Sequence, residues 1–120
     1  MPKPKPATWD TVRRFALTLP GVEEGTAYGT PALRVRGKFM ARLHEDRDSL
    51  VIKVGFDERD FRMQADPRTF YNTKHYHGYP TVLVRLSRVR SKDLRDVIEV
   101  AWRRIAPKGV VTEFERRANS

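Results

Sequence analysis

One stretch of eleven residues, Phe70 to Pro80, gathers side chains that could do chemistry. It holds four aromatic rings, two of the three histidines in the chain and Lys74. Gly78 and Pro80 interrupt regular backbone just before residues 81–86, which are rich in strand-forming side chains. Loops that present aromatic and ionisable groups on a rigid scaffold are common places for binding. The stretch therefore predicts either a binding loop or a set of aromatic side chains that covers one end of a small core.

Metal binding and nucleophilic catalysis are the reactive alternatives for these side chains. His75 and His77 could place two imidazoles at a metal, with His44, Glu45 or Asp46 as further ligands. Two histidines in one loop are a weak signal beside a helical metalloprotease motif or paired cysteines. The chain has no cysteine, no nucleophile elbow and no glycine-rich phosphate loop. We therefore expect a protein that is not an enzyme and that uses no metal or cofactor.

Hydrophobic periodicity predicts the elements that position this stretch. Apolar residues recur at helical spacing before Pro20 and after Ser91, whereas residues 22–54 alternate with period two between short turns. A short helix after Asp57 and a long strand from Thr81 complete the pattern. The predicted helices cover residues 8–19, 57–65 and 91–106. The predicted strands cover residues 23–28, 32–36, 39–44, 49–54 and 81–89.

The order α-β-β-β-β-α-β-α predicts a two-layer α+β domain in which helices cover one face of an antiparallel sheet. Strand alternation assigns one set of side chains to the core: Leu33, Val35, Phe39, Ala41, Leu43, Leu50, Ile52 and Val54. The opposite face then carries a largely cationic set: Arg34, Arg36, Met40, Arg42, Val51, Lys53 and Arg85. In the short helix, Phe61 and Ala65 are the expected buried contacts, and Phe61 pairs with Phe56 as a hydrophobic staple. We therefore expect a basic sheet face that nothing covers.

Bulk composition limits the class of protein. The 120 residues suit one domain, which we place at residues 8–110, between a disordered basic leader at 1–7 and a charged tail at 111–120. The chain has no cysteine and no apolar run long enough to cross a membrane, so we expect a cytoplasmic protein without a membrane partner. Its net charge of +9 favours polyanionic partners.

Four blocks of sequence, in this order and spacing, resemble a known family. They are residues 19–24 (LPGVEE), 28–32 (YGTPA), 37–43 (GKFMARL) and 75–80, which lead into 82–86 (VLVRL). Together they are similar to the bacterial MmcQ/YjbR family. The resemblance implies a compact α+β fold, related in shape to type III secretion chaperones, and a DNA-binding role through wing-like β-hairpins. It places these wings at the hairpin 36–38 and at the turn 46–48, although the second turn is acidic and would repel phosphate.

Charge and resemblance together predict that the protein binds DNA without sequence preference, through phosphate contacts on the basic sheet face and its hairpin. The predicted nucleic-acid-binding residues are Arg34, Arg36, Lys38, Arg42, Lys53, Lys74, His75, Tyr76 and Arg85. One alternative is a protein-interaction module, chaperone-like or homodimeric, with Met40, Val51 and Leu83 as the apolar centre of its interface. Another is a small-ligand pocket framed by Tyr28 and the aromatic stretch.

Overall fold

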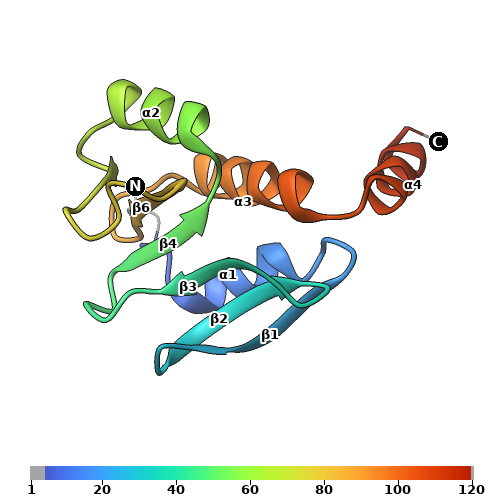
Figure 1. Cartoon of the computed structure of the whole chain (residues 1–120), viewed down its shortest axis with the longest axis horizontal. Coiled ribbons are helices and arrows are strands. Elements are labelled where there is room, and N and C mark those ends of the chain that lie inside the picture. Colours follow the sequence, from blue (N-terminus) through green and yellow to red (C-terminus); the bar gives the residue numbers. More distant parts are fainter. Residues whose placement is uncertain (1–4, 120) are drawn as a thin grey trace.

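The computed structural model describes residues 5–119, so residues 1–4 of the predicted leader and Ser120 of the predicted tail lie outside it. The described residues form four helices and six strands (Figure 1). The helices are α1 Trp9–Ala16, α2 Phe56–Ala65, α3 Ser91–Ile105 and α4 Lys108–Ala118. The strands are β1 Val22–Ala27, β2 Thr30–Val35, β3 Lys38–Leu43, β4 Ser49–Lys53, β5 Phe70–Tyr71 and β6 Thr81–Arg85. None of these helices is long and apolar enough to cross a membrane.

The strands form one sheet in the order β1-β2-β3-β4-β6-β5, and every neighbouring pair is antiparallel. Consecutive hairpins build the first four strands, which confirms the predicted α+β fold with an antiparallel sheet. The turn between β2 and β3 uses Arg36 and Gly37, with φ angles of 49° and 84°. Two positive φ angles in a two-residue turn suit the right-handed twist of paired strands. Arg36 therefore belongs to this turn and not to the sheet face.

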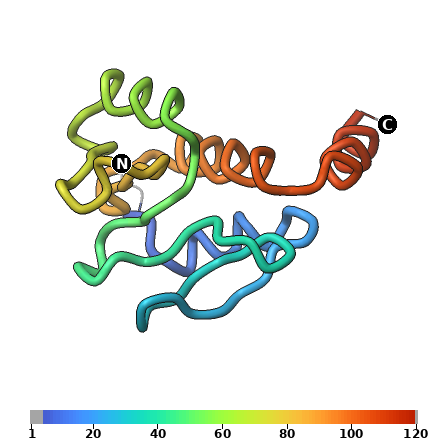
Figure 2. Tube along the Cα trace, in the orientation of Figure 1, coloured from blue at the N-terminus to red at the C-terminus, as the bar shows by residue number. Residues whose placement is uncertain are grey.

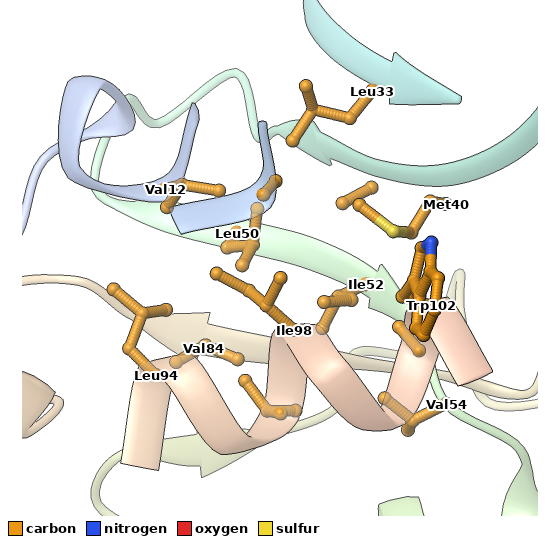
Figure 3. Packing of buried hydrophobic residues seen from close by; sticks show 14 of the residues in the cluster. Val12, Leu33, Met40, Leu50, Ile52, Val54, Val84, Leu94, Ile98 and Trp102 are labelled. Carbon is orange, nitrogen blue, oxygen red and sulfur yellow. The ribbon is translucent and has the colours of Figure 1, made fainter. Parts of the chain in front are cut away.

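Helices α1 and α3 pack against each other and cover one face of the sheet. Trp102 of α3 is fully buried beside Met40, while Ile98 and Leu50 fill the space between helix and sheet (Figure 3). The indole Nε1 of Trp102 donates a hydrogen bond to the carbonyl oxygen of Pro20 at 2.8 Å. A buried indole needs such a partner, and this bond ties α3 to the turn that follows α1.

Strand β3 contains one residue that has no partner on β2. Leu33 pairs with Ala41 and Arg34 pairs with Phe39, so Met40 forms a β-bulge between the two pairs. The extra residue shifts the alternation of side chains. Met40 is fully buried in the core, whereas Phe39 lies on the opposite face of the sheet with Arg34. The prediction that Phe39 packs inward and Met40 outward is therefore wrong, because strict alternation cannot contain an unpaired residue.

Helix α2 faces the rest of the molecule mainly with arginines, together with the partly buried Met63. Arg59 and Arg62 are each 8% exposed, whereas Phe61 is 67% exposed and Ala65 is also exposed. The guanidinium of Arg62 donates to Asp96 of α3 and stacks over the Phe70 ring, 5.4 Å from its centroid. The predicted staple and the predicted burial of Phe61 and Ala65 are wrong, because Arg59 and Arg62 lie on the buried side of this helix, with Met63 as its partly buried apolar contact.

The C-terminal end of the chain is more regular than predicted. Residues 108–118 form α4, where we expected a charged tail. In Figure 2 this helix lies beyond the end of α3, on the side away from α2. The ring of Phe114 packs edge-on against Trp102, with 4.9 Å between centroids, and Glu115 forms an ion pair with Arg103 of α3. These contacts explain why the segment is ordered.

Candidate binding groove between the sheet and the aromatic loop

The aromatic loop, residues 72–80, closes over part of the sheet face that we expected to be open. Val51 of β4 and Leu83 of β6 lie on this face, yet they are only 1% and 0% exposed. Next to them, the hydroxyl groups of Tyr71 and Ser49 form a hydrogen bond of 2.6 Å. The prediction of an uncovered face is therefore wrong for the half of the sheet built from β4 and β6.

Arg42 of β3 is the link between the sheet and the aromatic loop. The residue is 4% exposed, and its guanidinium donates to the hydroxyl of Tyr76 at 2.5 Å, to Glu45 at 2.9 Å and to the carbonyl oxygen of Leu43 at 3.2 Å. Burial lowers the pKa of Arg42, but the hydrogen bonds to Tyr76 and Glu45 outweigh this effect and leave the pKa above its ordinary value. Arg42 therefore stays charged while it holds the loop in place.

The backbone of the loop is held at its end by Arg59 of α2. The guanidinium donates to the carbonyl oxygens of His77 at 2.8 Å and Tyr79 at 3.1 Å. The next carbonyl oxygen, that of Pro80, accepts from the amides of Val54 and Gly55, each at 3.0 Å. Loop carbonyls that would otherwise lack partners are thus satisfied, so the loop can keep one conformation.

A pocket of about 800 Å³ lies between the loop and the β2–β3 half of the sheet. We call it the aromatic pocket, because four aromatic residues other than histidine contribute to its walls. It is lined by Ala27, Tyr28, Arg34, Phe39, Arg42, Glu45, Val51, Lys53, His75, Tyr76, Tyr79, Pro80 and Thr81. The β-bulge is the reason that Phe39 is among them.

Two tyrosines of the aromatic pocket leave much of their surface to solvent: Tyr28 is 84% exposed and Tyr79 is 56% exposed. Tyr28 and Gly29 have φ angles of 55° and 78° in the turn between β1 and β2, a geometry that projects the Tyr28 ring from the hairpin. The Arg42 guanidinium lies 5.2 Å from the centroid of this ring, within the range of a cation–π contact. Both sides of the pocket therefore end in a ring that a flat ligand can contact.

The charged groups of the aromatic pocket are mainly cationic. Arg34, Arg42 and Lys53 line it, with Glu45 as the single carboxylate among its lining residues. The backbone amide of Glu45 and the Arg42 guanidinium lower the pKa of the Glu45 carboxyl, so this group is ionised at neutral pH. The Arg34 guanidinium donates to the carbonyl oxygen of Thr26 at 3.1 Å. Lys53 is exposed, and its side chain has no hydrogen bond or ion pair with any residue from 5 to 119.

Thr81 supplies a polar atom that the fold leaves without a partner. Its side chain is 7% exposed, and Oγ1 is a buried side-chain atom without a hydrogen bond in the part of the chain that the structure describes. Such an atom costs about 1–3 kcal/mol when it is left unpaired. Thr81 also lines the aromatic pocket, next to Lys53 on the neighbouring strand. A rotation of the Thr81 side chain would offer the hydroxyl to a ligand.

A second hollow of about 500 Å³ adjoins the aromatic pocket and shares Phe39, Lys53 and Pro80 with it. We call it the cationic pocket, and we call the two adjoining pockets together the groove. Its other lining residues are Lys38, Gly55, Arg104 and Ile105. No acidic residue is among the residues that line it.

The structure gathers some of the predicted binding residues and separates others. Arg34, Arg42, Lys53, His75 and Tyr76 line the aromatic pocket, and Lys38 lines the cationic pocket together with Lys53. The remaining three predicted residues, Arg36, Lys74 and Arg85, line neither pocket.

Separate contacts account for these three residues. The side chain of Arg36 lies near Gly21, and Lys74 is exposed in the loop. The guanidinium of Arg85 stacks on the Tyr71 ring, 4.0 Å from its centroid. Lys53 pairs with Thr81 at one end of β6, whereas Arg85 pairs with Ser49 at the other, so Arg85 lies away from the groove.

Sequence reasoning missed Phe39, Thr81 and Arg104 as groove residues. The alternation of β3 hid Phe39, and Arg104 looked like an ordinary surface residue near the end of a helix. No local pattern connects Arg104 with Gly55, because the two are far apart in the chain.

The histidines lie apart from any arrangement that could hold a metal. His75 packs edge-on against Tyr76, with 4.7 Å between ring centroids, and His77 is exposed. His44 lies in the turn after β3, where its Nδ1 is 3.4 Å from a carboxylate oxygen of Asp46. Within residues 5–119, no three side chains of the metal-binding types come together.

Asp46 organises the turn that carries Glu45. One of its carboxylate oxygens accepts from the amides of Asp48 and Ser49, each at 2.9 Å. Partial burial raises the pKa of Asp46, but these hydrogen bonds outweigh it and hold the pKa below its ordinary value. A pKa that is lower in the folded than in the unfolded state stabilises the fold above the unfolded pKa of about 4, and this contribution is lost as the pH falls through the folded pKa.

We therefore expect Asp46→Asn to lower the free energy of unfolding by about 1 kcal/mol at neutral pH and by much less at about pH 3. Urea denaturation of both proteins at the two pH values measures the difference. A difference that does not change with pH would show that the carboxylate charge has no part in holding the turn.

The chain is similar to known proteins in both sequence and fold. The family model described as YjbR matches residues 17–104. The uncharacterized proteins Rv2570 of Mycobacterium tuberculosis and Mb2600 of Mycobacterium bovis are each 32% identical to this chain over 126 residues, covering 90% of this chain and 95% of theirs. The crystal structure of the Deinococcus radiodurans protein DR2400, with the family-model domain DUF419, has the same fold, with a TM-score of 0.68 and 21% identity over 80% of this chain and 76% of that one. The chain therefore belongs to the YjbR family.

Proposed function

We propose that this YjbR-family protein binds DNA without sequence preference, and that it prefers single strands to duplexes. The observation that carries the proposal is that exposed aromatic rings and cationic side chains share one groove. The net charge of +9 supports a polyanionic partner. The proposed role is binding, and no reaction is assigned to the groove.

Exposed rings favour an unpaired strand over a duplex. Bases of a single strand can stack on aromatic side chains, and each stacked base contributes about 1–3 kcal/mol irrespective of its identity. Tyr28 and Tyr79 offer such rings at the aromatic pocket. A duplex keeps its bases stacked on one another, so it would use only the cationic groups.

The side chains available for phosphate differ from those expected for a flat basic face. Arg42 is already bonded to Tyr76 and Glu45, and Arg34 is bonded to a backbone carbonyl of β1. Lys38 and Lys53 are exposed. We therefore assign the phosphate contacts to the lysines and assign Arg42 to the wall of the pocket. Few contacts imply a shallow dependence of affinity on salt.

Fluorescence anisotropy of a labelled oligothymidylate across a salt series tests the proposal. Lys53→Gln is expected to weaken binding and to reduce the slope of log K against log salt by about 0.7, the value for one phosphate contact on a single strand. Lys92→Gln is the matched control, because Lys92 is an exposed lysine at the start of α3 and lines neither groove pocket. Equal effects of the two substitutions, or no binding of the single strand at low salt, would contradict the proposal.

The size of the aromatic pocket supports a second candidate, a small anionic ligand with a flat ring. Its volume of about 800 Å³ falls within the range of roughly 300–1,000 Å³ found for small-molecule sites. Competition separates the two candidates. If a much longer unlabelled strand displaces the oligothymidylate, but thymidine monophosphate at the same nucleotide concentration does not, the result favours DNA. Equal displacement by the two competitors favours the small ligand.

A protein interface on this face is less well supported. Met40, Val51 and Leu83, which would have formed its apolar centre, are all buried within the chain.

A further inference from the structure

We propose that the cationic pocket is a binding site for a terminal phosphate group. It lies beside the aromatic pocket, so that the phosphate of a bound strand end is held by Lys38, Lys53 and Arg104. This inference rests on the proposed function and deepens it, because it makes the phosphorylated end of a strand the preferred substrate class.

The first support is a concentration of positive charge without a counter-ion. Lys38 comes from the start of β3, Lys53 from the end of β4 and Arg104 from the last turn of α3. The side chain of none of the three forms a hydrogen bond or ion pair with another residue in the described part of the chain. No carboxylate from the described residues lines the pocket. Like charges repel one another, and a bound dianion would relieve that repulsion.

The adjacent arginine of α3, which lies outside the pocket, has carboxylate partners. Arg103, one residue away, donates to Glu99 at 3.2 Å and also pairs with Glu115 of α4. These hydrogen bonds raise the pKa of Arg103, the one to Glu115 most strongly. Residues 5–119 thus supply carboxylates to Arg103 outside the pocket and none to Arg104 inside it.

The second support is the way the backbone accommodates Arg104. A Cβ atom at Gly55 would lie 2.6 Å from Cζ of Arg104, so the guanidinium packs directly on the glycine backbone. Gly55 has a φ of 91° and a ψ of 159°, a conformation that is essentially restricted to glycine. The junction between β4 and α2 therefore has the one residue type that lets the guanidinium lie there.

The chemistry of the three groups suits a phosphate monoester. A guanidinium can donate two parallel hydrogen bonds to phosphate oxygens, and lysine ammonium groups add charge from other directions. Gly55 is also the residue before the first turn of α2, whose positive end adds to the potential at the pocket. Lys53 and Phe39 belong to both pockets, so a nucleotide could place its ring in one pocket and its phosphate in the other.

The test compares labelled oligothymidylates that are identical except for a 5′-phosphate or a 5′-hydroxyl end. We expect the wild-type protein to bind the phosphorylated strand about tenfold more tightly, as one charge-assisted hydrogen bond or more would give. In Arg104→Gln, the ratio of the affinities for the phosphorylated and the hydroxyl-ended strand should fall to about two or less. Arg68→Gln is the matched control, because Arg68 is exposed and lines neither groove pocket, and it should keep the wild-type ratio. Thermal melting checks that both variants are folded.

A ratio near one in the wild-type protein would overturn the inference while leaving the proposed function standing, provided that both strands bind. An equal fall of the ratio in Arg104→Gln and Arg68→Gln would also overturn it, because the effect would then be one of overall charge.

A second measurement covers the case in which neither strand binds. Inorganic phosphate is titrated at constant ionic strength, with chloride as the reference, and amide resonances are followed by NMR. Phosphate-specific shifts at Gly55 and Lys53 that disappear in Arg104→Gln would support the phosphate site even though the DNA proposal had failed. The absence of such shifts would overturn the site as well.

Discussion

Replacing Arg42 by methionine is expected to lower the free energy of unfolding by about 3 kcal/mol and to release the aromatic loop from the sheet. Methionine keeps much of the apolar stem but donates no hydrogen bond. The hydroxyl of Tyr76, the carboxylate of Glu45 and the carbonyl oxygen of Leu43 would all lose the hydrogen bonds that Arg42 donates. The carbonyl oxygen and the hydroxyl lie in a part-buried region, so their lost hydrogen bonds are not simply replaced by water.

Denaturant unfolding of Arg42→Met measures this loss, and amide hydrogen exchange over residues 72–80 shows whether the loop is released. Tyr76→Phe is the matched control, since it removes one bond to Arg42 and keeps the ring. It should lower the free energy of unfolding by about 1 kcal/mol. If Arg42→Met were no worse than Tyr76→Phe, the other contacts of the guanidinium would be unimportant and Arg59 alone would hold the loop.

Replacing Gly55 by alanine is expected to lower the free energy of unfolding by up to about 3 kcal/mol, because no other residue type adopts its φ and ψ without strain. The new methyl group would also displace the Arg104 guanidinium from its place against the backbone. We therefore expect this variant to lose the preference for a 5′-phosphate as well as stability.

Gly109→Ala is the control for this substitution. Gly109 lies in α4, has no atom within 4 Å of the position of a new Cβ, and does not have a positive φ. Alanine there should raise stability by about 0.5–1 kcal/mol, the ordinary gain in a helix. Because the Arg104 guanidinium can move away from a new methyl group, Gly55→Ala should lower the free energy of unfolding by nearly the same amount in the wild-type protein and in Arg104→Ala. Calorimetry of the four proteins in that cycle measures the coupling. A large coupling would mean that the clash with Arg104, and not the backbone conformation, limits this position.

The order and pairing of the first four strands were predictable because their signals are local. Residues 22–54 alternate with period two and carry turn-forming residues between the strands, so consecutive hairpins were the expected outcome. The apolar stripe of α3 was equally clear, and Leu94, Val97, Ile98 and Ala101 are buried as expected.

Helix α2 was predicted wrongly because its contacts do not follow hydrophobicity. Arg59 and Arg62 are buried since loop carbonyls and Asp96 accept their hydrogen bonds. Those acceptors come from segments that follow much later in the chain. Periodicity assigns arginine to the solvent side and phenylalanine to the core, so it reversed the orientation of this helix.

The candidate groove was partly predictable. The aromatic stretch was recognisable by its composition, and Lys53, His75 and Tyr76 were among the predicted binding residues that the structure brings to one pocket. The covering of the sheet face was not predictable, because it depends on the bond between Tyr76 and Arg42, which the sequence separates widely. Arg104 and Gly55 illustrate the same limit, since only the folded chain brings them together.

The unpaired residue in β3 separates the packing of the interior from the ligand-facing surface. A strand one residue shorter, without Met40, would return to strict alternation while Phe39 stayed opposite Arg34, so the groove would keep its ring and the interior would lose the Met40 side chain. The extra residue therefore adds a side chain to the core without taking a position from the groove. In this fold, the deletion of one residue from β3 can change how the interior is filled while the ligand-facing side chains stay in place.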